Sequence, residues 1–356
     1  MKTVYLGMSG GVDSGVSAAI LKQQGYRVVG VYMKNWSKNL PGMQCPWAED
    51  LADAKRIATG LDIDFKVFDF EKEYKQRVVD YMLDEYKKGN TPNPDIMCNQ
   101  EVKFRLFADK SFADGADLIA TGHYAKMGEI DGRPALMRAK DDNKDQTYFL
   151  YRAPIETLAR TLFPIGNLTK PEVKTKAAEF GLHIVKKPES MGICFIGEAD
   201  IQDFLAEFID IVPGDICQAE TGEVIGEHDG AILYTLGQRH GLYLGGGLPY
   251  YVVGKDIQKN IVYVSQDLNH PNLWADKLEL TDLIWRGKQP VENLVENSQN
   301  TPVNVLVRLR HRAPLIPAKL KGNTIYFDEA IRRPAPGQSA VLYDDQVCLG
   351  GGIICN

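Results

Sequence analysis

The sequence lacks the cysteine patterns that define most zinc sites and disulfide-rich proteins. Its cysteines form no Cys-x-x-Cys pair, and no Cys/His spacing matches a zinc site. The six cysteines are Cys45, Cys98, Cys194, Cys217, Cys348 and Cys355. The 356 residues also contain no run of 18 apolar residues and no leader segment with a charged start and an apolar stretch. We therefore expect a cytoplasmic protein with free thiols and no membrane partner.

Basic residues are also fewer than acidic residues. The chain has 41 lysines and arginines against 47 aspartates and glutamates, which gives a net charge of −6. This balance does not exclude a nucleic-acid partner. It does require that any phosphate-binding surface be local, built from a clustered basic face.

The glycine-rich turn near the N-terminus lacks the features of the two common phosphate loops. No lysine follows its glycines, as a Walker loop requires, and their spacing is not G-x-G-x-x-G. Residues 3–8 predict a strand, residues 9–14 (Ser-Gly-Gly-Val-Asp-Ser) a tight turn, and residues 15–22 a helix. Glycine lets backbone N–H groups approach an anion, and a helix start favours negative charge. An ordinary glycine-rich turn between strand and helix is the alternative interpretation.

The next 200 residues alternate strand and helix patterns. Strands are predicted at 26–33, 63–68 and 117–124, and helices at 48–61, 71–88 and 100–114. This alternation predicts an α/β fold with a doubly wound parallel sheet, in which ligands bind beyond the carboxyl ends of the strands. We therefore expect residues 7–14, Met33, Gly122 and His123 to converge on one crevice.

The pattern changes after about residue 212. A predicted hairpin at 126–140 and short helices at 154–160, 171–180 and 201–209 still belong to the first part. From residue 213 onward, short alternating strands are separated by turns rich in Gly, Asn and Asp, which indicates all-β structure. We predict an α/β domain at 1–212, a small central domain at 213–276 and a C-terminal β-barrel at 277–356.

Two of the cysteines lie in irregular segments rather than in strands. Cys98 follows a proline-rich loop and precedes a helix, and Cys194 lies in a loop flanked by glycines. Amides at a helix start lower the pKa of a thiol, although Asp95, three residues earlier, opposes this effect. Both cysteines are therefore candidates for reactivity. The alternative is that they are buried, inert thiols, as most free cysteines are.

Several motifs along the chain resemble those of one family, the bacterial tRNA-specific 2-thiouridylases and their mitochondrial relatives. The motifs are Ser9–Ser14, Asn93-Pro94-Asp95-x-x-Cys98, Thr121–Tyr124, Lys144-Asp145-Gln146, Gly192–Gly197 and Tyr234–Leu242. The resemblance runs from the first strand to the C-terminal barrel. It implies a pyrophosphate-loop domain of the adenine nucleotide alpha hydrolase type, which cleaves ATP to AMP and pyrophosphate.

The family's chemistry assigns roles to these residues by resemblance. ATP, with Mg²⁺, adenylates O2 of the wobble uridine in tRNAs for Lys, Glu and Gln, and a persulfide on Cys194 then supplies sulfur. Cys98 attacks that persulfide or closes a disulfide with Cys194, and Asp95 acts as general acid or base. The persulfide donor is a cysteine desulfurase or a relay protein. The nucleotide-binding residues are Gly7, Met8, Ser9, Gly10, Gly11, Val12, Asp13, Ser14, Met33 and Gly122.

The resemblance also implies which residues contact tRNA. They are Asn93, Pro94, Asp95, His123, Lys144, Asp145, Gln146, Arg310, His311 and Gln338. Lys140 adds positive charge beside the Lys144-Asp145-Gln146 motif. Alternation along a strand predicts that Arg308, Arg310 and Arg312 point together at phosphates, although a solvated β face is the alternative.

Three other interpretations stay open at the level of sequence. The chain could be a pyrophosphate-loop ligase that forms amides, which would not need the two cysteines. It could be an RNA-binding protein with a relict nucleotide site, which would form no AMP. Within the family, Cys98, Cys194 and Asp95 could instead bind an iron–sulfur cluster, although two thiolates without Cys-x-x-Cys make a thin ligand set. No other metal site is expected.

Overall fold

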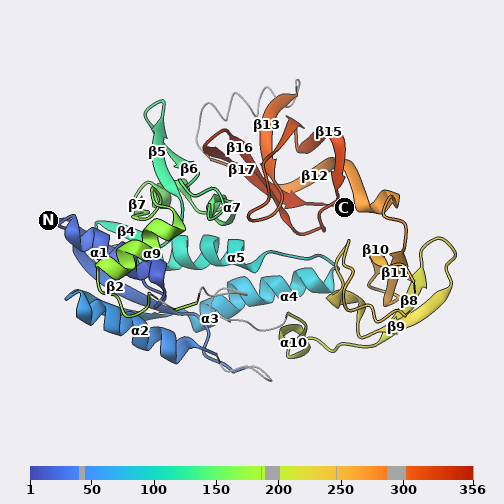
Figure 1. The fold of residues 1–356 in the computed structure, drawn as a ribbon, viewed down its shortest axis with the longest axis horizontal. Coiled ribbons are helices and arrows are strands. Elements are labelled where there is room, and N and C mark those ends of the chain that lie inside the picture. The colour runs from blue at the N-terminus through green and yellow to red at the C-terminus, as the bar shows by residue number, and fades with distance from the viewer. Residues whose placement is uncertain (40–44, 186, 189–200, 246, 287–301, 356) are drawn as a thin grey trace.

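The computed structural model describes residues 1–39, 45–185, 187–188, 201–245, 247–286 and 302–355. The chain folds into a parallel-sheet domain, a small mixed sheet and a barrel, which lie next to one another in Figure 1. No described helix is long and apolar enough to cross a membrane.

The N-terminal domain is built on a five-stranded parallel sheet with the order β3-β2-β1-β4-β7. Its central strand, β1, is buried because Val4, Tyr5 and Leu6 pack on both of its faces. The strands are β1 (Thr3–Gly7), β2 (Arg27–Lys34), β3 (Asp64–Asp69), β4 (Leu118–Thr121) and β7 (Thr161–Leu162). The predicted parallel α/β sheet is therefore confirmed.

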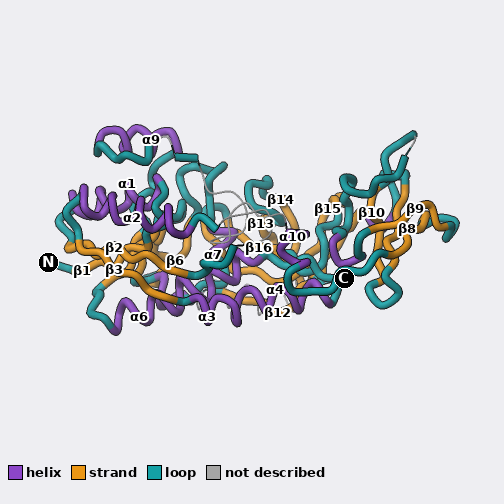
Figure 2. Tube along the Cα trace, turned by 90° about the horizontal axis from the view of Figure 1, so that it is seen from below, coloured by secondary structure: helices purple, strands orange, loops and turns teal. Residues whose placement is uncertain are grey.

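Helices cover both faces of this sheet, as Figure 2 shows. One face carries α1 (Val12–Gln23), α2 (Trp47–Gly60) and α9 (Lys170–Glu179). The other face carries two long helical stretches, residues 71–87 and 94–113, each interrupted by a π-helical segment. Their parts are α3 (Glu71–Tyr74), Lys75–Val79 (π) and α4 (Asp80–Lys87), then α5 (Pro94–Met97), Cys98–Leu106 (π) and α6 (Phe107–Ala113).

The second of these stretches begins earlier than the sequence pattern predicts. A start at residue 100 is wrong because Asn93 caps the helix: its side-chain oxygen accepts a hydrogen bond from Ile96 N at 3.3 Å, and Pro94 takes the first helical position. Cys98 therefore lies inside the helix, at the first residue of its π-helical segment.

The predicted hairpin is confirmed as β5 (Lys126–Ile130) and β6 (Arg133–Met137). Asp131 and Gly132 both have positive φ, as a tight two-residue hairpin turn requires. Short helices follow: α7 (Thr147–Leu150), α8 (Ile155–Leu158) and α10 (Ile201–Ala206). The hairpin also joins the C-terminal barrel, because Met137 of β6 pairs with Val347 of β17.

The central domain is a four-stranded sheet with the order β10-β11-β8-β9. It is mixed, since β8 and β11 run parallel while the other neighbours are antiparallel. Its strands are β8 (Gly214–Gln218), β9 (Val224–His228), β10 (Tyr251–Asp256) and β11 (Ile261–Ser265), with short 3₁₀ turns at Ala231–Leu233 and Pro271–Leu273.

The C-terminal domain is a closed barrel, as the sequence predicts. Its strands follow the order β12-β15-β14-β13-β16-β17, and β12 pairs with β17 to close the ring. They are β12 (Trp274–Trp285), β13 (Val303–Arg308), β14 (Ile316–Lys321), β15 (Thr324–Arg332), β16 (Ser339–Asp344) and β17 (Val347–Ile354). The domain boundaries at 212 and 276 stay predictions.

A buried arginine fastens the barrel to the N-terminal domain. Arg286, just after β12, donates hydrogen bonds to the carbonyl oxygens of Leu150 (2.6 Å), Tyr151 (2.9 Å) and Ala153. Burial lowers its pKa to about 10, so the guanidinium stays charged at neutral pH. Its charge is therefore balanced by main-chain carbonyl groups at the end of α7.

We expect Arg286→Met to lower the free energy of unfolding by about 2–4 kcal/mol, because it leaves three buried carbonyl groups without donors. Denaturant unfolding followed by tryptophan fluorescence measures this loss. Arg133→Met, at an exposed site in β6, is the matched control and should change the midpoint little. An equal, small effect of both changes would contradict the anchoring role.

Candidate functional site

The glycine-rich turn lies at the carboxyl end of β1 and leads directly into α1. Gly10 has φ +73°, and a side chain there would collide with the carbonyl oxygen of Asp50 on α2. Gly11 is the N-cap residue and has no side-chain cap, so the first amide groups of α1 are not capped by a side chain. The Ser14 hydroxyl stiffens the turn, because it accepts from Ser9 N at 3.3 Å and donates to Gly11 O at 3.1 Å. The turn therefore presents glycines and main-chain amide groups without a side-chain cap, as the predicted anion site requires, and anion binding there stays a prediction.

Asp13 in this turn is paired with a lysine that the sequence analysis did not single out. Lys170, the first residue of α9, donates to both carboxylate oxygens of Asp13, at 2.7 and 2.8 Å. The Tyr124 hydroxyl donates to the same carboxylate at 3.0 Å. The side chain of Lys170 is almost fully buried, whereas Asp13 keeps about a third of its side chain exposed. A cation and an anion thus lie together at the glycine-rich turn of residues 9–14, which we call the phosphate turn after its predicted role.

Two predicted nucleotide residues line the turn from neighbouring strands. A Cβ atom on Gly7 would lie 3.0 Å from Met33 Cε, and one on Gly122 would lie 2.9 Å from Ser14 N. Gly122 is therefore needed for close packing against the backbone of the turn, whereas a side chain at Gly7 would meet the flexible end of Met33. The structure brings residues 7–14, Met33 and Gly122 together at the carboxyl ends of β1, β2 and β4.

Cys98 is fully buried, and this overturns the expected effect of the helix on its thiol. Burial raises its pKa to about 12, with a smaller rise from Asp95, while Lys103 lowers it. The expectation of a lowered pKa is wrong because Cys98 lies inside a helix, below the surface, rather than at the helix start. The thiol is therefore protonated at neutral pH in this conformation.

His123 lies between Gly122 at the phosphate turn and Lys103, the residue whose charge lowers the pKa of Cys98. It follows Gly122, its Nδ1 lies 2.8 Å from Thr121 Oγ1, and its Nε2 lies 3.4 Å from Lys103 Nζ. Burial and the charge of Lys103 hold its pKa well below the usual value. The ring packs between Phe104 and Phe163. In this conformation it is a neutral, buried ring and is not available for stacking on an RNA base.

The Lys-Asp-Gln motif at 144–146 is mostly turned inward. Asp145 is buried and accepts hydrogen bonds from Ala139 N (3.1 Å), Thr147 Oγ1 (2.8 Å) and the guanidinium of Arg308. Gln146 Oε1 accepts from Tyr124 N at 2.9 Å. Asp145 and Gln146 therefore shape the loop that presents Lys144. Lys140, expected to add positive charge there, is in an ion pair with Glu172 at 2.8 Å.

The expected row of arginines on one strand face is wrong. The strand β13 ends at Arg308, which is only 3% exposed and pairs with Asp145. Arg310 and Arg312 are exposed beyond the strand, and the φ of Arg312 is +64°. His311 packs against Phe149 at 4.6 Å between ring centroids, and burial lowers its pKa to about 4. Strand alternation therefore fails where the strand stops.

The segment that leads into the Asn93–Cys98 motif is held by contacts from the other two domains. Thr91 N donates to Pro336 O at 2.8 Å, and Gln338 Nε2 donates to Thr91 O at 2.6 Å. The hydroxyl of Thr91 also lies 3.3 Å from that of Thr235 in the central domain. Gln338, predicted to contact tRNA, thus uses one hydrogen of its side-chain amide to bind Thr91, two residues before Asn93.

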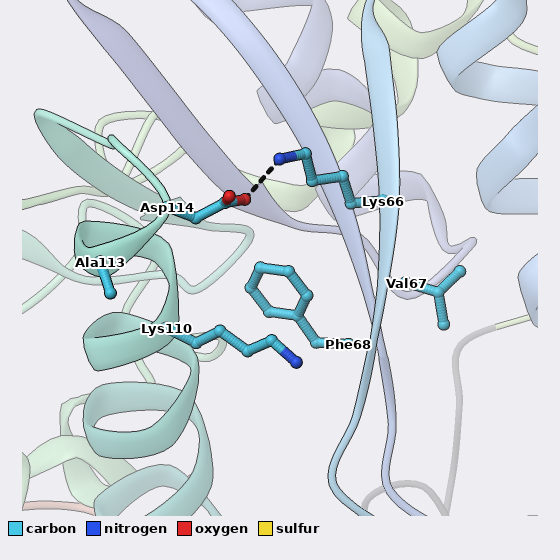
Figure 3. Close-up of a pocket in the computed structure, with 6 residues that line it drawn as sticks. All are labelled: Lys66, Val67, Phe68, Lys110, Ala113 and Asp114. Atoms are coloured by element: carbon cyan, nitrogen blue, oxygen red, sulfur yellow. Dashed lines mark hydrogen bonds and ion pairs between the residues drawn. The ribbon is translucent and has the colours of Figure 1, made fainter.

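One part of the predicted site cannot be placed: Cys194 and its motif 192–197 are outside the described residues. Within the described residues, no group of three His, Cys, Asp or Glu side chains could hold a metal ion. A surface cavity of about 510 Å³ opens at β3 and α6, between Phe68 and the Lys66–Asp114 pair (Figure 3). Asp114 stands before β4, at the amino end of the sheet, so this cavity is remote from the phosphate turn.

Comparison with known proteins decides the family. Residues 2–198 match the family described as "tRNA methyl transferase HUP domain", residues 202–266 its "PRC-barrel domain", and residues 276–354 the "Aminomethyltransferase beta-barrel domain". The tRNA-specific 2-thiouridylase MnmA of Bacillus subtilis is 43% identical over 99% of this chain and 94% of its own length. That of Pseudomonas paraeruginosa is 46% identical over the same shares. The chain belongs to the tRNA-specific 2-thiouridylase family.

Solved structures resemble the chain more distantly than these 2-thiouridylases do. A 4-thiouridine synthetase in complex with RNA and ATP has a TM-score of 0.35 and 19% identity, over 58% of this chain and 50% of its own. The NMN synthetase of Francisella tularensis has a TM-score of 0.34 and 15% identity, over 55% and 68%. We draw no inference from similarities at this level.

Proposed function

We propose that this protein is an ATP-dependent tRNA-uridine 2-sulfurtransferase that converts the wobble uridine of tRNAs for Lys, Glu and Gln to 2-thiouridine. The observation that carries the proposal is the full-length match to relatives named tRNA-specific 2-thiouridylase. The words "methyl transferase" belong only to the description of the matching domain families. The relatives that match the whole chain carry the thiouridylase name.

The first step in this proposal is adenylation of the uridine O2. That oxygen attacks the α-phosphorus of ATP, pyrophosphate leaves, and the poor leaving group at C2 becomes AMP. The uncapped amides of α1 and the Ser9 and Ser14 hydroxyl groups would bind the pyrophosphate. Gly7, Met33 and Gly122 form the close-packed edge against which adenine and ribose would lie.

Asp13 is suited to hold the Mg²⁺ that accompanies ATP. Magnesium in nucleotide sites takes one or two carboxylates together with phosphate oxygens, and Asp13 supplies a partly exposed carboxylate at the turn. When bound, the ion would neutralise the charge of the pyrophosphate group. Lys170, now paired with Asp13, would then turn its ammonium group toward the leaving pyrophosphate.

The second step is sulfur transfer. By the family resemblance, Cys194 carries the sulfur to be transferred as the terminal sulfur of a persulfide. In one route that terminal sulfur attacks C2 of the adenylated uridine and AMP leaves; Cys98 then attacks Cys194 Sγ, the S–S bond to the uridine breaks, and 2-thiouridine is released as the Cys98–Cys194 disulfide forms. In the other, Cys98 attacks the persulfide and frees hydrosulfide as the nucleophile. Asp95, one helical turn before Cys98, would move the proton.

Cys98 must be uncovered for either route. A thiol with a pKa of about 12 is a poor nucleophile, and the one charge that lowers this pKa belongs to Lys103. We propose that binding of the extruded uridine opens the site around Cys98. The π-helical segment that begins at Cys98 and ends at Leu106 is a natural place for such a rearrangement.

Contacts with tRNA are proposed on the family resemblance. We propose direct contacts by Asn93, Pro94, Asp95, Lys144, Arg310, His311 and Gln338, and a base contact by His123 once the site opens. Asp145 would act by holding the loop of Lys144 rather than by touching RNA. A cytoplasmic location and a separate persulfide donor complete the proposal.

Mass spectrometry of nucleosides tests the function directly. Purified protein is incubated with ATP, Mg²⁺, a tRNA transcript and a persulfide donor, and 2-thiouridine is expected at the wobble position together with AMP and pyrophosphate. A transcript with cytidine at that position is the matched control and should gain no sulfur. Unmodified tRNA and no AMP would instead favour a non-catalytic RNA-binding protein. Colour and iron in anaerobically purified protein would favour the iron–sulfur alternative.

A further inference from the structure

The turn between the central domain's 3₁₀ helix and β10 is held rigidly. The Gln238 side chain accepts from Thr235 N at 3.0 Å and donates to His240 O at 2.9 Å. The Tyr234 hydroxyl donates to Gly241 O at 2.9 Å. Main-chain hydrogen bonds join Gly237 and Gln238 to Val252 of β10. Residues 234–242 thus form one fixed unit, with Leu242 buried at its end.

This unit exposes an aromatic side chain. Tyr243, the next residue, is 90% exposed and has φ +48°, a backbone region that favours glycine. A large aromatic ring in solvent at a strained position gains nothing from packing within the protein. We regard it as a ring presented for contact with a partner.

The charge around Tyr243 suits an anionic partner. Arg239 and His240 are exposed on the same turn, and no acidic residue occurs between Asp229 and Asp256. The central domain is otherwise rich in carboxylates, so this stretch is locally positive on an acidic protein. Exposed aromatic rings next to arginine are typical of surfaces that stack unpaired bases and contact phosphates.

The turn is also continuous with the proposed catalytic site. Thr235, at its base, lies 3.3 Å from the hydroxyl of Thr91, two residues before the Asn93–Cys98 motif. The central sheet lies at the opposite end of the molecule from α1 in both Figure 1 and Figure 2. A single partner that reaches from the phosphate turn to this domain must therefore be extended, as a tRNA is.

We propose that Tyr243 and Arg239 form a second tRNA-binding surface, separate from the pocket for the target uridine. Tyr243 stacks on an unpaired base of the tRNA, and Arg239 contacts a phosphate. This surface raises the affinity for tRNA and takes no part in the reaction. Its loss therefore weakens tRNA binding and leaves the ATP site unchanged. This inference rests on the proposed function, since it concerns how the same substrate is held.

Equilibrium binding of full-length tRNA by fluorescence anisotropy tests the proposal. Tyr243→Phe keeps the ring and should bind within about twofold of the wild type, whereas Tyr243→Ala and Tyr243→Gly should weaken binding about tenfold. Glycine suits the positive φ at this position, so Tyr243→Gly removes the ring without destabilising the turn. Arg239→Ala should also weaken binding and reduce the slope of log affinity against log salt by about one. In the thiolation assay, KM for tRNA should rise while kcat at saturating tRNA is unchanged.

Val224→Ala, at an exposed apolar position on β9, is the matched control and should bind tRNA as the wild type does. Unchanged tRNA affinity in both Tyr243→Ala and Tyr243→Gly would overturn the proposal. So would a defect seen only with a protein persulfide donor and absent with inorganic sulfide, because it would assign the turn to a protein partner. Failure of the wild type to form 2-thiouridine while it still binds tRNA would instead overturn the proposed function alone.

Discussion

Cys98→Ser is expected to abolish 2-thiouridine formation, with a loss of at least about a thousandfold. A serine hydroxyl can neither attack a persulfide nor form a disulfide, and loss of a reacting thiol is among the largest single-residue effects in catalysis. Because the first step does not need the thiol, pyrophosphate release should persist in this variant. Nucleoside mass spectrometry and pyrophosphate release, measured on the same samples, separate the two steps.

Cys348→Ser is the matched control for this experiment. Cys348 is also fully buried, and burial raises its pKa to about 11, but it lies in β17 of the barrel. It should retain thiolation activity. Equal activity of Cys98→Ser and the wild type would contradict the sulfur-transfer mechanism and favour an amide-forming ligase.

The raised pKa of Cys98 adds an expectation about reactivity. With a pKa of about 12, roughly one thiol in 10⁴ is ionised at pH 8. Alkylation of Cys98 by iodoacetamide should therefore be slow in the free protein and should accelerate as pH rises toward 12. Addition of tRNA and ATP should accelerate it at constant pH, and peptide mapping identifies the labelled residue. Rapid labelling of the free protein at pH 7 would contradict a buried resting state.

Asp13→Asn is expected to reduce formation of AMP and pyrophosphate by about 10²–10³-fold, as loss of one charged group at a phosphate site does. Asparagine is the same size and can still accept hydrogen bonds from Lys170 and Tyr124. It lacks the charge needed to hold Mg²⁺. The fold is thus preserved while the first step fails, and a pyrophosphate-release assay with tRNA present measures the loss.

Asp114→Asn is the control for Asp13→Asn. Asp114 also pairs with a lysine, Lys66, but lies in the surface cavity of Figure 3, far from the phosphate turn. Its replacement should leave pyrophosphate release unchanged. If both variants were fully active, Asp13 would have no role beyond holding Lys170.

Local patterns allowed much of the architecture to be predicted from the sequence. The apolar run before Ser9-Gly10-Gly11 predicts β1 and the turn, and the Asp131-Gly132 pair predicts the hairpin, because each depends on a few neighbouring residues. The closed barrel follows from regularly spaced short strands. Such features require no knowledge of distant contacts.

What the sequence could not reveal depends on contacts between distant residues. Thr169 and Glu172 form a capping box that marks the start of α9, yet nothing local indicates that Lys170 reaches Asp13, 157 residues away. The same holds for Arg308, which alternation places at the surface but which Asp145 draws into the interior. The burial of Cys98, too, comes from the packing of the whole helix and not from its position in the motif.

The clamp on Thr91 has a consequence for synthesis of the protein. The phosphate turn is translated long before Pro336 and Gln338, whose contacts fix the segment ahead of Cys98. A nascent chain still on the ribosome therefore has its ATP loop without the brace on its sulfur-transfer helix. Activity should begin only when the last strands of the barrel have emerged and closed.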